Sequence, residues 1–271
     1  MGKSILSGFN KNEVLVFVGA HPDDETMIGP VLAYAADRCK MVAVICLTKG
    51  ESGWNLDKED LTRTLAEVRN AEFERCQKVL KTRPIMLSYT NGLTRAHPKG
   101  LAVLDLVDAA VKRWKSKAAG KESSMDIYER WTKERGDPKD AILKLLKELG
   151  ATIVITMDPL VGCTRHPEHV TVSEATSRAM DEYRKKIKPE AVFYYLWRTP
   201  EPPLDSTFEI PKECEVLPAK DFPKDGGKDY IEIGETGYEC YKSQYPDLAV
   251  ERKKGGLRRY KDVNFYFQTV K

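Results

Sequence analysis

Three of the four histidines in this chain lie in two short motifs that also contain proline and acidic residues. The first motif reads A-H-P-D-D-E and contains His21, Asp23 and Asp24. The second reads H-P-E-H, and its His166 and His169 are spaced to share one face of a helix. Imidazole and carboxylate groups suit zinc, and a catalytic zinc keeps three protein ligands and one open position. The two motifs therefore indicate a catalytic metal site.

Each motif also has a plainer explanation when it is taken alone. Acids in the first turn of a helix stabilise the helix macrodipole, and histidines can cap a helix start. The macrodipole does not explain a histidine before the acids, nor two adjacent aspartates at the end of a buried strand. Two similar motifs in one chain favour the metal site over both plainer explanations.

Predicted strands precede the two motifs. Val14–Gly19 is a continuous apolar run that ends in glycine, which is typical of a strand buried on both faces of a parallel sheet. Thr152–Thr156 is a similar run, and a loop joins it to the second motif. Ligand sites in open α/β sheets lie at the carboxyl ends of strands. We therefore expect both motifs at the same edge of one sheet.

The alternation of strands and helices predicts a Rossmann-like, doubly wound α/β fold. We expect a mostly parallel sheet with helices on both faces and a smaller, irregular C-terminal part. Residues 1–198 are predicted to form the catalytic core, with a charged insertion at about 118–136, and residues 199–271 an extension that packs on the core and is not an independent domain. The further strands are expected at Met41–Leu47, Pro84–Tyr89 and Ala191–Trp197, and the helices at Thr26–Arg38, Leu61–Leu80, Leu101–Lys117, Pro138–Leu149 and Val170–Lys186.

Composition and charge exclude several classes of protein. The 44 basic and 41 acidic residues leave a net charge of only +3, which disfavours a nucleic-acid partner because phosphate binding needs a strong basic excess. No apolar run approaches the roughly 20 residues of a membrane helix, so we expect no transmembrane segment. The six cysteines form no CxxC pair and are interpreted as reduced thiols. These features predict a cytoplasmic protein.

The two motifs resemble those of the PIG-L/LmbE-like family of zinc-dependent N-acetylglucosamine de-N-acetylases. The first family motif is reproduced letter for letter, and the second, H-P-D-H, differs only at Glu168. The resemblance runs from about residue 14 to residue 191. Weaker matches to the family are Thr48–Glu51 for its T-x-G-E motif, Arg69 and Glu72 for R-x-x-E, and Ser243–Gln244 for the end of H-x-S-Q. Three further positions depart from the family: Asn91–Gly92 stands where Asp-Gly is usual, Thr164 where tyrosine is frequent, and Tyr241 where H-x-S-Q has its histidine.

The resemblance implies a role for each residue of the two motifs. His21, Asp24 and His169 would bind Zn²⁺, which would polarise the acetyl carbonyl and lower the pKa of a water molecule. Asp23 would be the general base that takes the proton of this water and delivers it to the leaving amine. His166 would stabilise the oxyanion as a cation oriented by Glu168, which is not itself a ligand.

Arg69 has two interpretations that the sequence does not separate. It could bind sugar hydroxyls or a phosphate of the substrate. It could equally be a surface arginine of a helix, paired with Glu72 or another nearby acid.

The function implied by the resemblance is removal of the acetyl group from an N-acetylated amino sugar of the N-acetylglucosamine type, releasing acetate and a free amine. The substrate would be small and soluble. One alternative is a related amide hydrolase acting on a non-acetyl or non-sugar amide. Another is a catalytically silent metal-binding or sugar-binding protein, which the intact Asp23 disfavours. The basic stretch at 252–261 favours a solvated face or an oligomer contact over RNA or membrane binding, so self-association stays open.

Overall fold

The structure is a computed structural model that describes residues 4–53, 55–57, 62–92, 123–164, 166–197, 209–255, 259–260 and 263–271. The helix predicted over Leu101–Lys117 lies outside the described residues. So do the first five residues of the predicted insertion and residues 199–208 of the predicted extension.

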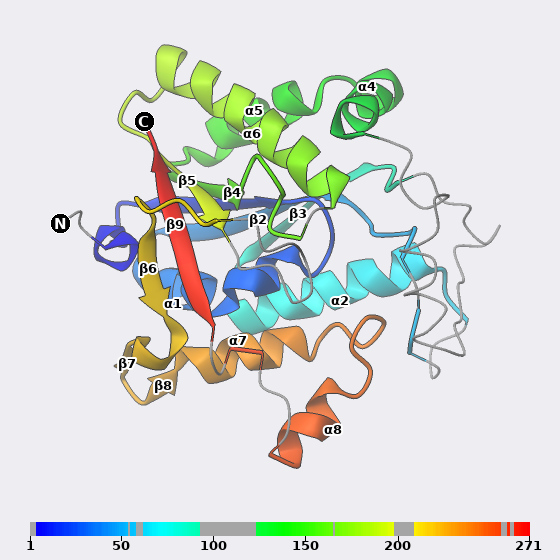
Figure 1. The fold of residues 1–271 in the computed structure, drawn as a ribbon, viewed down its shortest axis with the longest axis vertical. Helices are drawn as coiled ribbons and strands as arrows, with labels where there is room; N and C mark the ends of the chain where they lie inside the picture. The colour runs from blue at the N-terminus through cyan, green and yellow to red at the C-terminus, as the bar shows by residue number, and fades with distance from the viewer. Residues whose placement is uncertain are drawn as a thin grey trace.

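A seven-stranded sheet in the order β3-β2-β1-β4-β5-β9-β6 forms the centre of the molecule (Figure 1). The five strands from β1 to β5 are parallel, and β9 runs antiparallel to both of its neighbours. This confirms the predicted α/β fold with a mostly parallel sheet. The strands are β1 Val14–Gly19, β2 Met41–Thr48, β3 Arg83–Tyr89, β4 Ile153–Met157, β5 Val192–Trp197, β6 Glu215–Pro218 and β9 Asn264–Val270, with a separate hairpin of β7 Lys224–Asp225 and β8 Lys228–Asp229.

Helices cover both faces of the sheet (Figure 1). Every residue of β1 is buried, and its side chains alternate between two apolar cores: Phe17 packs on one face, and Val16 and Val18 on the other. One face carries α1 Gly29–Arg38, α2 Leu65–Leu80 and α7 Tyr230–Tyr238; the other carries α4 Ser124–Arg135, α5 Pro138–Leu149 and α6 Pro167–Lys186. The shorter helices are α8 Leu248–Lys253 and the 3₁₀ helices Ile5–Gly8, Asp24–Ile28 and Ala219–Asp221.

The part of the predicted charged insertion that forms α4 packs into the core. Ile127, Tyr128 and Trp131 lie on one side of this helix and are buried in the core that α5 and α6 share. Their spacing is that of an amphipathic helix. The many charged residues of the segment hid this apolar face in the sequence.

The segment after residue 208 adds β6 and β9 to the sheet and places α7 against α1 and α2. The central sheet therefore continues across the boundary predicted at residue 198.

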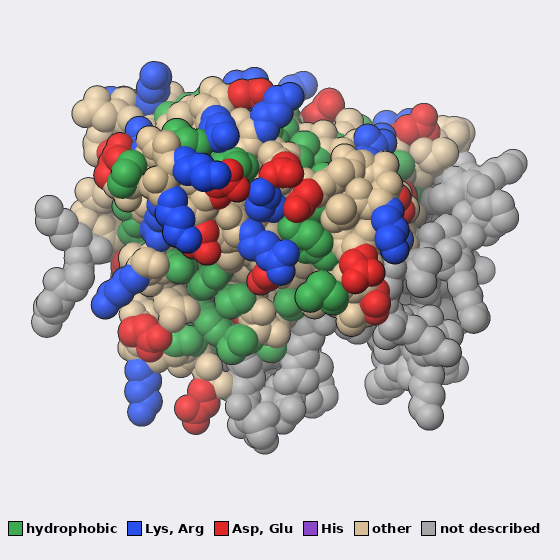
Figure 2. Space-filling view, turned by 90° about the horizontal axis from the view of Figure 1, so that it is seen from above, with side chains coloured by type: hydrophobic (Ala, Val, Ile, Leu, Met, Phe, Trp, Pro, Cys, Tyr) green, Lys and Arg blue, Asp and Glu red, His purple; other side chains and the backbone are tan. Residues whose placement is uncertain are grey.

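The face formed by α4, α5 and α6 carries basic and acidic side chains that are interspersed rather than segregated (Figure 2). Lys139 and Lys186 pair with Glu182, and Arg178 pairs with Glu174. In the basic stretch at 252–261, Arg252 pairs with Glu232 and Glu239. Among the described residues, none of the helices has the length and apolar character that crossing a membrane requires.

Candidate metal centre and active site

The two histidine motifs meet at the carboxyl end of the parallel sheet. The first motif follows β1 and the second follows the loop after β4, and these two strands are neighbours. His21, His166 and His169 each place one ring nitrogen in a cluster, and these three nitrogens lie within 4.8 Å of one another. The sequence prediction that both motifs share one edge of the sheet is therefore confirmed by the geometry.

Three ligand atoms converge with the spacing that a tetrahedral metal ion needs. His21 Nδ1 lies 3.0 Å from His169 Nε2, which lies 3.1 Å from Asp24 Oδ1. His21 Nδ1 is 3.8 Å from the other Asp24 oxygen, Oδ2. Zinc–ligand bonds of about 2.0–2.1 Å place tetrahedral ligands about 3.4 Å apart, so the separations between these three side chains suit one metal ion.

The direction of the hydrogen bonds supports this fit. His169 Nδ1 donates to the carbonyl oxygen of Gly162 at 2.8 Å, which leaves Nε2 as the nitrogen that faces the Asp24 carboxylate. An unprotonated nitrogen and a carboxylate oxygen are both acceptors, and they repel each other unless a cation lies between them. The chemistry of this donor set therefore calls for positive charge at the point where the three atoms converge.

The carboxylates and histidines of the cluster shift one another's pKa values. Burial alone would lower the pKa of His21, but the nearby carboxylates of Asp24 and Glu168 outweigh it and raise this pKa to about 10. Burial alone would raise the pKa of Asp24, but its contacts with His169 and His21 hold it well below its usual range. The site therefore favours positive charge next to the carboxylates of Asp24 and Glu168.

Asp23 stands apart from this cluster although it is the neighbour of Asp24 in sequence. Its backbone adopts the left-handed region, with φ of 105°, which is unusual for a residue other than glycine. Its Oδ1 atom lies 3.0 Å from Arg69 Nη2, and its side chain keeps 18% of its surface exposed. Burial raises the pKa of Asp23, and the charge of Arg69 opposes this rise. The two aspartates therefore face different partners in different charge environments.

Arg69 is not the surface residue that one of the two sequence interpretations described. It is only 4% exposed, and its guanidinium donates to the Pro22 carbonyl as well as contacting Asp23. A Cβ atom on Gly50 would lie 2.8 Å from Arg69 Nε, so the loop after β2 packs directly on the guanidinium. Glu72, the acid expected to pair with Arg69, instead accepts hydrogen bonds from Ser243. The role of Arg69 in substrate binding stays a prediction.

His166 caps helix α6, while the carboxylate of Glu168, the residue expected to orient His166, contacts His21. His166 Nδ1 accepts the backbone N–H of Glu168 at 3.3 Å, whereas the Glu168 carboxylate lies 2.5 Å from His21 Nε2. Glu168 therefore orients His21, because it occupies the nitrogen of that ring that faces away from the ligand cluster. Burial, with the nearby His21 and His169, lowers the pKa of His166 to about 3, which favours the neutral imidazole rather than the expected cation.

Glu51, Asn91 and Gly92 were matched to the family motifs without being given a role. The fully buried Glu168 accepts hydrogen bonds from Asn91 Nδ2 and from the backbone N–H of Gly92. Glu51 Oε1 accepts the backbone N–H of Asn91 at 2.9 Å. The soft matches T-x-G-E and Asn-Gly were the signal in the sequence that could have assigned these residues to the site.

A second group of polar residues supports the first motif from behind. Glu25 is 1% exposed and accepts hydrogen bonds from Gln77 Nε2, from the Tyr241 hydroxyl and from the backbone N–H of Asp23. Tyr241, which stands where the family has a histidine, thus connects the C-terminal segment to the metal-binding loop. Nothing in the composition of either segment indicated this contact.

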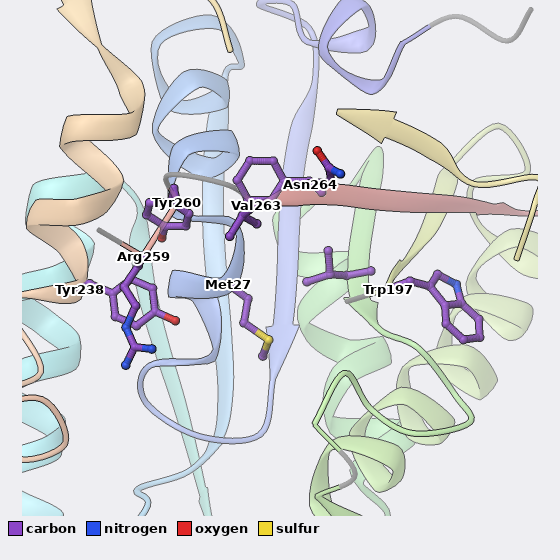
Figure 3. Close-up of a pocket in the computed structure, with 9 residues that line it drawn as sticks. Met27, Trp197, Tyr238, Arg259, Tyr260, Val263 and Asn264 are labelled. Carbon is purple, nitrogen blue, oxygen red and sulfur yellow. The ribbon is translucent and has the colours of Figure 1, made fainter. Parts of the chain in front are cut away.

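A small pocket lies at the same edge of the sheet, where β5 ends and β9 begins (Figure 3). Met27, Trp197 and Tyr260 are among the residues that line it, and none of the motif histidines does. Its volume of about 10 Å³ has room for roughly one water molecule. We conclude that this pocket is too small to bind a sugar.

Comparisons with known proteins agree with the motifs. A 1D-myo-inositol 2-acetamido-2-deoxy-alpha-D-glucopyranoside deacetylase of Catenulispora acidiphila is 30% identical over 169 residues, which are 62% of this chain and 44% of that relative. The chain spans about half the length of the curated relatives that it matches.

Solved structures show the same fold at low sequence identity. The N,N'-diacetylchitobiose deacetylase of Pyrococcus horikoshii aligns with a TM-score of 0.55 and 14% identity, covering 95% of this chain and 84% of that chain. The 4-carboxy-2-hydroxymuconate hydratase of Pseudomonas putida aligns with a TM-score of 0.53 and 12% identity, covering 96% of each chain. Because the second structure is named as a hydratase, the fold alone does not identify the reaction.

The family model described as PIG-L, GlcNAc-PI de-N-acetylase, matches residues 16–180. This span contains both histidine motifs, most of β1, and the whole of β2, β3 and β4, but it ends before β5. The chain therefore belongs to the PIG-L family.

Proposed function

We propose that this protein is a zinc-dependent hydrolase that removes the acetyl group from an N-acetylated amino sugar. The observation that carries the proposal is the separation of the two adjacent aspartates. Asp24 faces the converging histidine nitrogens, while Asp23 lies outside them against Arg69. A site that only binds metal needs no second carboxylate, whereas hydrolysis needs a group that moves a proton.

Each residue of the site has a distinct task in this proposal. His21, Asp24 and His169 hold the metal, which supplies Lewis acidity toward the carbonyl and toward water when it is bound. Asp23 takes a proton from the attacking water and returns it to the amide nitrogen. The hydroxyl of the water joins the acetyl carbon, the C–N bond breaks, and acetate and a free amine leave. His166, next to the His21 ring with ring centroids 4.6 Å apart, donates a hydrogen bond to the carbonyl oxygen as it gains negative charge.

The surroundings of the proposed metal ligands are polar. Within the described residues, Glu51 Oε2 and Arg69 Nε are buried and make no hydrogen bond. One is an acceptor and the other a donor. Hydrogen bonds link Glu51 to Asn91 and Asn91 to Glu168, and an ion pair links Arg69 to Asp23. Polar surroundings of this kind suit a polar amide substrate better than an apolar one.

The experiment that tests the proposal is an acetate-release screen of the zinc-loaded protein. The substrates are N-acetylglucosamine, its disaccharide, and N-acetylglucosamine glycosides with malate and inositol aglycones. We expect acetate and free amine in equal amounts from at least one substrate, and release slowed about 10²-fold or more in the Asp23→Asn variant. Binding of a substrate without turnover would instead favour a silent sugar-binding protein. Hydrolysis confined to non-acetyl or non-sugar amides would favour the other alternative.

We also propose a cytoplasmic location for this enzyme. The six cysteines, all within the described residues, form no disulfide, and four of them are buried where they act as small apolar side chains. Free thiols are typical of proteins in reducing compartments. Fractionation of cells that express the full chain would test the location.

A further inference from the structure

Asp158 follows β4 directly and its carboxylate organises the loop that leads to the second histidine motif. The residue is completely buried. Its Oδ1 atom accepts the backbone N–H groups of Leu160 at 3.0 Å and Val161 at 2.7 Å. Its Oδ2 atom accepts the backbone N–H of Cys163 at 2.6 Å. One side chain thus satisfies three backbone donors of one short loop.

This loop has a backbone conformation that needs such support. Gly162 and Cys163 are both left-handed, with φ of 56° and 62°. A left-handed residue other than glycine costs on the order of 1 kcal/mol, so Cys163 would not keep this conformation without compensation. Successive N–H groups that point inward form a concavity that binds an anion, and the Asp158 carboxylate fills it.

The loop conformation fixes His169, one of the three proposed metal ligands. The carbonyl oxygen of Gly162 lies 2.8 Å from His169 Nδ1, and a carbonyl only accepts hydrogen bonds. The imidazole proton is therefore held on Nδ1, and Nε2 faces the metal position. The packing is also tight, because a Cβ atom on Gly162 would lie only 2.4 Å from His169 Cβ.

We propose that Asp158 is a positioning residue for His169 and acts through the backbone of the loop at 158–164. Its carboxylate holds the Gly162 carbonyl in place, and this carbonyl selects the His169 tautomer that binds metal through Nε2. The inference rests on the proposed metal-dependent function, because it requires His169 to be a ligand. It adds a residue that lies outside both histidine motifs and touches neither metal nor substrate.

The test compares Asp158→Asn with the parent protein in two measurements. Asparagine keeps the size of the side chain, but its amide nitrogen cannot accept the Cys163 N–H. We expect zinc affinity, measured by competition with a chelator, to fall about 10-fold to 100-fold, as for other partners of metal ligands. We also expect ¹⁵N NMR of the metal-free protein to show a smaller share of the Nδ1-protonated tautomer of His169. Parent-like affinity and tautomer in a folded Asp158→Asn variant would overturn the proposal.

Two further variants separate positioning from a general loss of stability. Asp137→Ala removes the cap of α5, where Asp137 accepts the Lys139 N–H, and should lower stability without changing zinc affinity. Thr164→Val removes the hydroxyl that lies 2.9 Å from His169 Nδ1 and should leave the tautomer unchanged, because the Gly162 carbonyl remains. A tautomer shift in Thr164→Val as large as in Asp158→Asn would refute the route through Gly162.

If Asp158→Asn does not fold, Gly162→Ala still tests the loop. The added methyl group collides with His169 Cβ, so we expect a similar loss of zinc affinity, and unchanged affinity would contradict the proposal. Failure of the proposed function is distinguishable from failure of this inference. A parent protein that binds no zinc would refute the function, while the tautomer measurement on metal-free protein would still decide whether Asp158 positions His169.

Discussion

The substitution Asp23→Asn separates proton transfer from metal binding at this site. Asparagine has the same shape as aspartate and tolerates the left-handed backbone that residue 23 adopts, with φ of 105°. Its side-chain oxygen can still accept from Arg69 Nη2, which lies 3.0 Å from Oδ1 in the parent protein. The variant therefore loses the negative charge and the basicity of residue 23, and little else.

The expected effects on turnover and on stability differ in size. Loss of a general base slows turnover about 10²-fold to 10⁴-fold, which is about 2.7–5.5 kcal/mol of activation free energy. Two opposing terms act on stability: the variant no longer has to bury an ionised carboxylate, but the buried Arg69 loses an opposite charge. We expect them to leave a net change of about 1 kcal/mol in the free energy of unfolding, as for a typical substitution. Zinc content should stay at about one ion per chain.

The assay measures acetate release, zinc content and denaturant unfolding of the same preparations. Asp181→Asn, an exposed position on α6, is the matched control and should behave as the parent protein in all three measurements. Equal loss of zinc in Asp23→Asn and Asp24→Asn would show that the two aspartates have been assigned the wrong roles. Turnover within a factor of a few of the parent rate would show that another group moves the proton.

Three further predictions follow from the same contacts. Asp24→Asn and His169→Ala should each lose most of the zinc, measured by elemental analysis, because each removes one of three converging ligands; full zinc occupancy in either variant contradicts the ligand set. His166→Ala should keep zinc and slow turnover with little change in KM. His166→Asn can still cap α6, so it would be nearly as active as the parent if capping were the sole role of His166; we expect it to be slow as well. Asp37 contacts Lys228 and Tyr230, and although burial opposes it, these contacts lower its pKa to about 2. A lowered pKa stabilises the fold above the unfolded pKa of about 3.9, so Asp37→Asn should reduce the free energy of unfolding at pH 7, and its difference from the parent should shrink from about pH 4 to about pH 2; a difference independent of pH would refute this explanation.

The sequence predicts the central strands well because strands buried on both faces consist of continuous apolar runs. Val14–Gly19 matches β1 residue for residue, and Pro138–Leu149 matches α5, where Asp137 caps the helix and Pro138 occupies its first turn. The helix expected over Thr26–Arg38 is instead divided, because a 3₁₀ helix over Asp24–Ile28 precedes α1. Local patterns do not reveal this division.

The contacts between distant segments could not be predicted from the same patterns. Glu168 was expected beside His166, two residues away, but its side chain reaches His21 across the site. One of the two interpretations of Arg69 placed it on a helix surface, but the loop after β2 covers it. For both residues the sequence predicted the helix on which the residue lies. It could not predict which residues Glu168 and Arg69 contact, because these contacts depend on how the ends of β1, β2 and β4 come together.

The two departures from the family motifs at residues 91 and 168 are explained by one contact. Glu168 is one methylene longer than the aspartate usual in the motif, and its carboxylate reaches both His21 Nε2 and Asn91 Nδ2 at 2.5 Å. An aspartate at position 91 would place a second carboxylate against a fully buried one, and like charges that close cannot both stay ionised. An amide at position 91 donates a hydrogen bond instead, so the longer acid requires the neutral residue. The pair leaves His21 with the carboxylate partner that orients its ring toward Asp24 and His169.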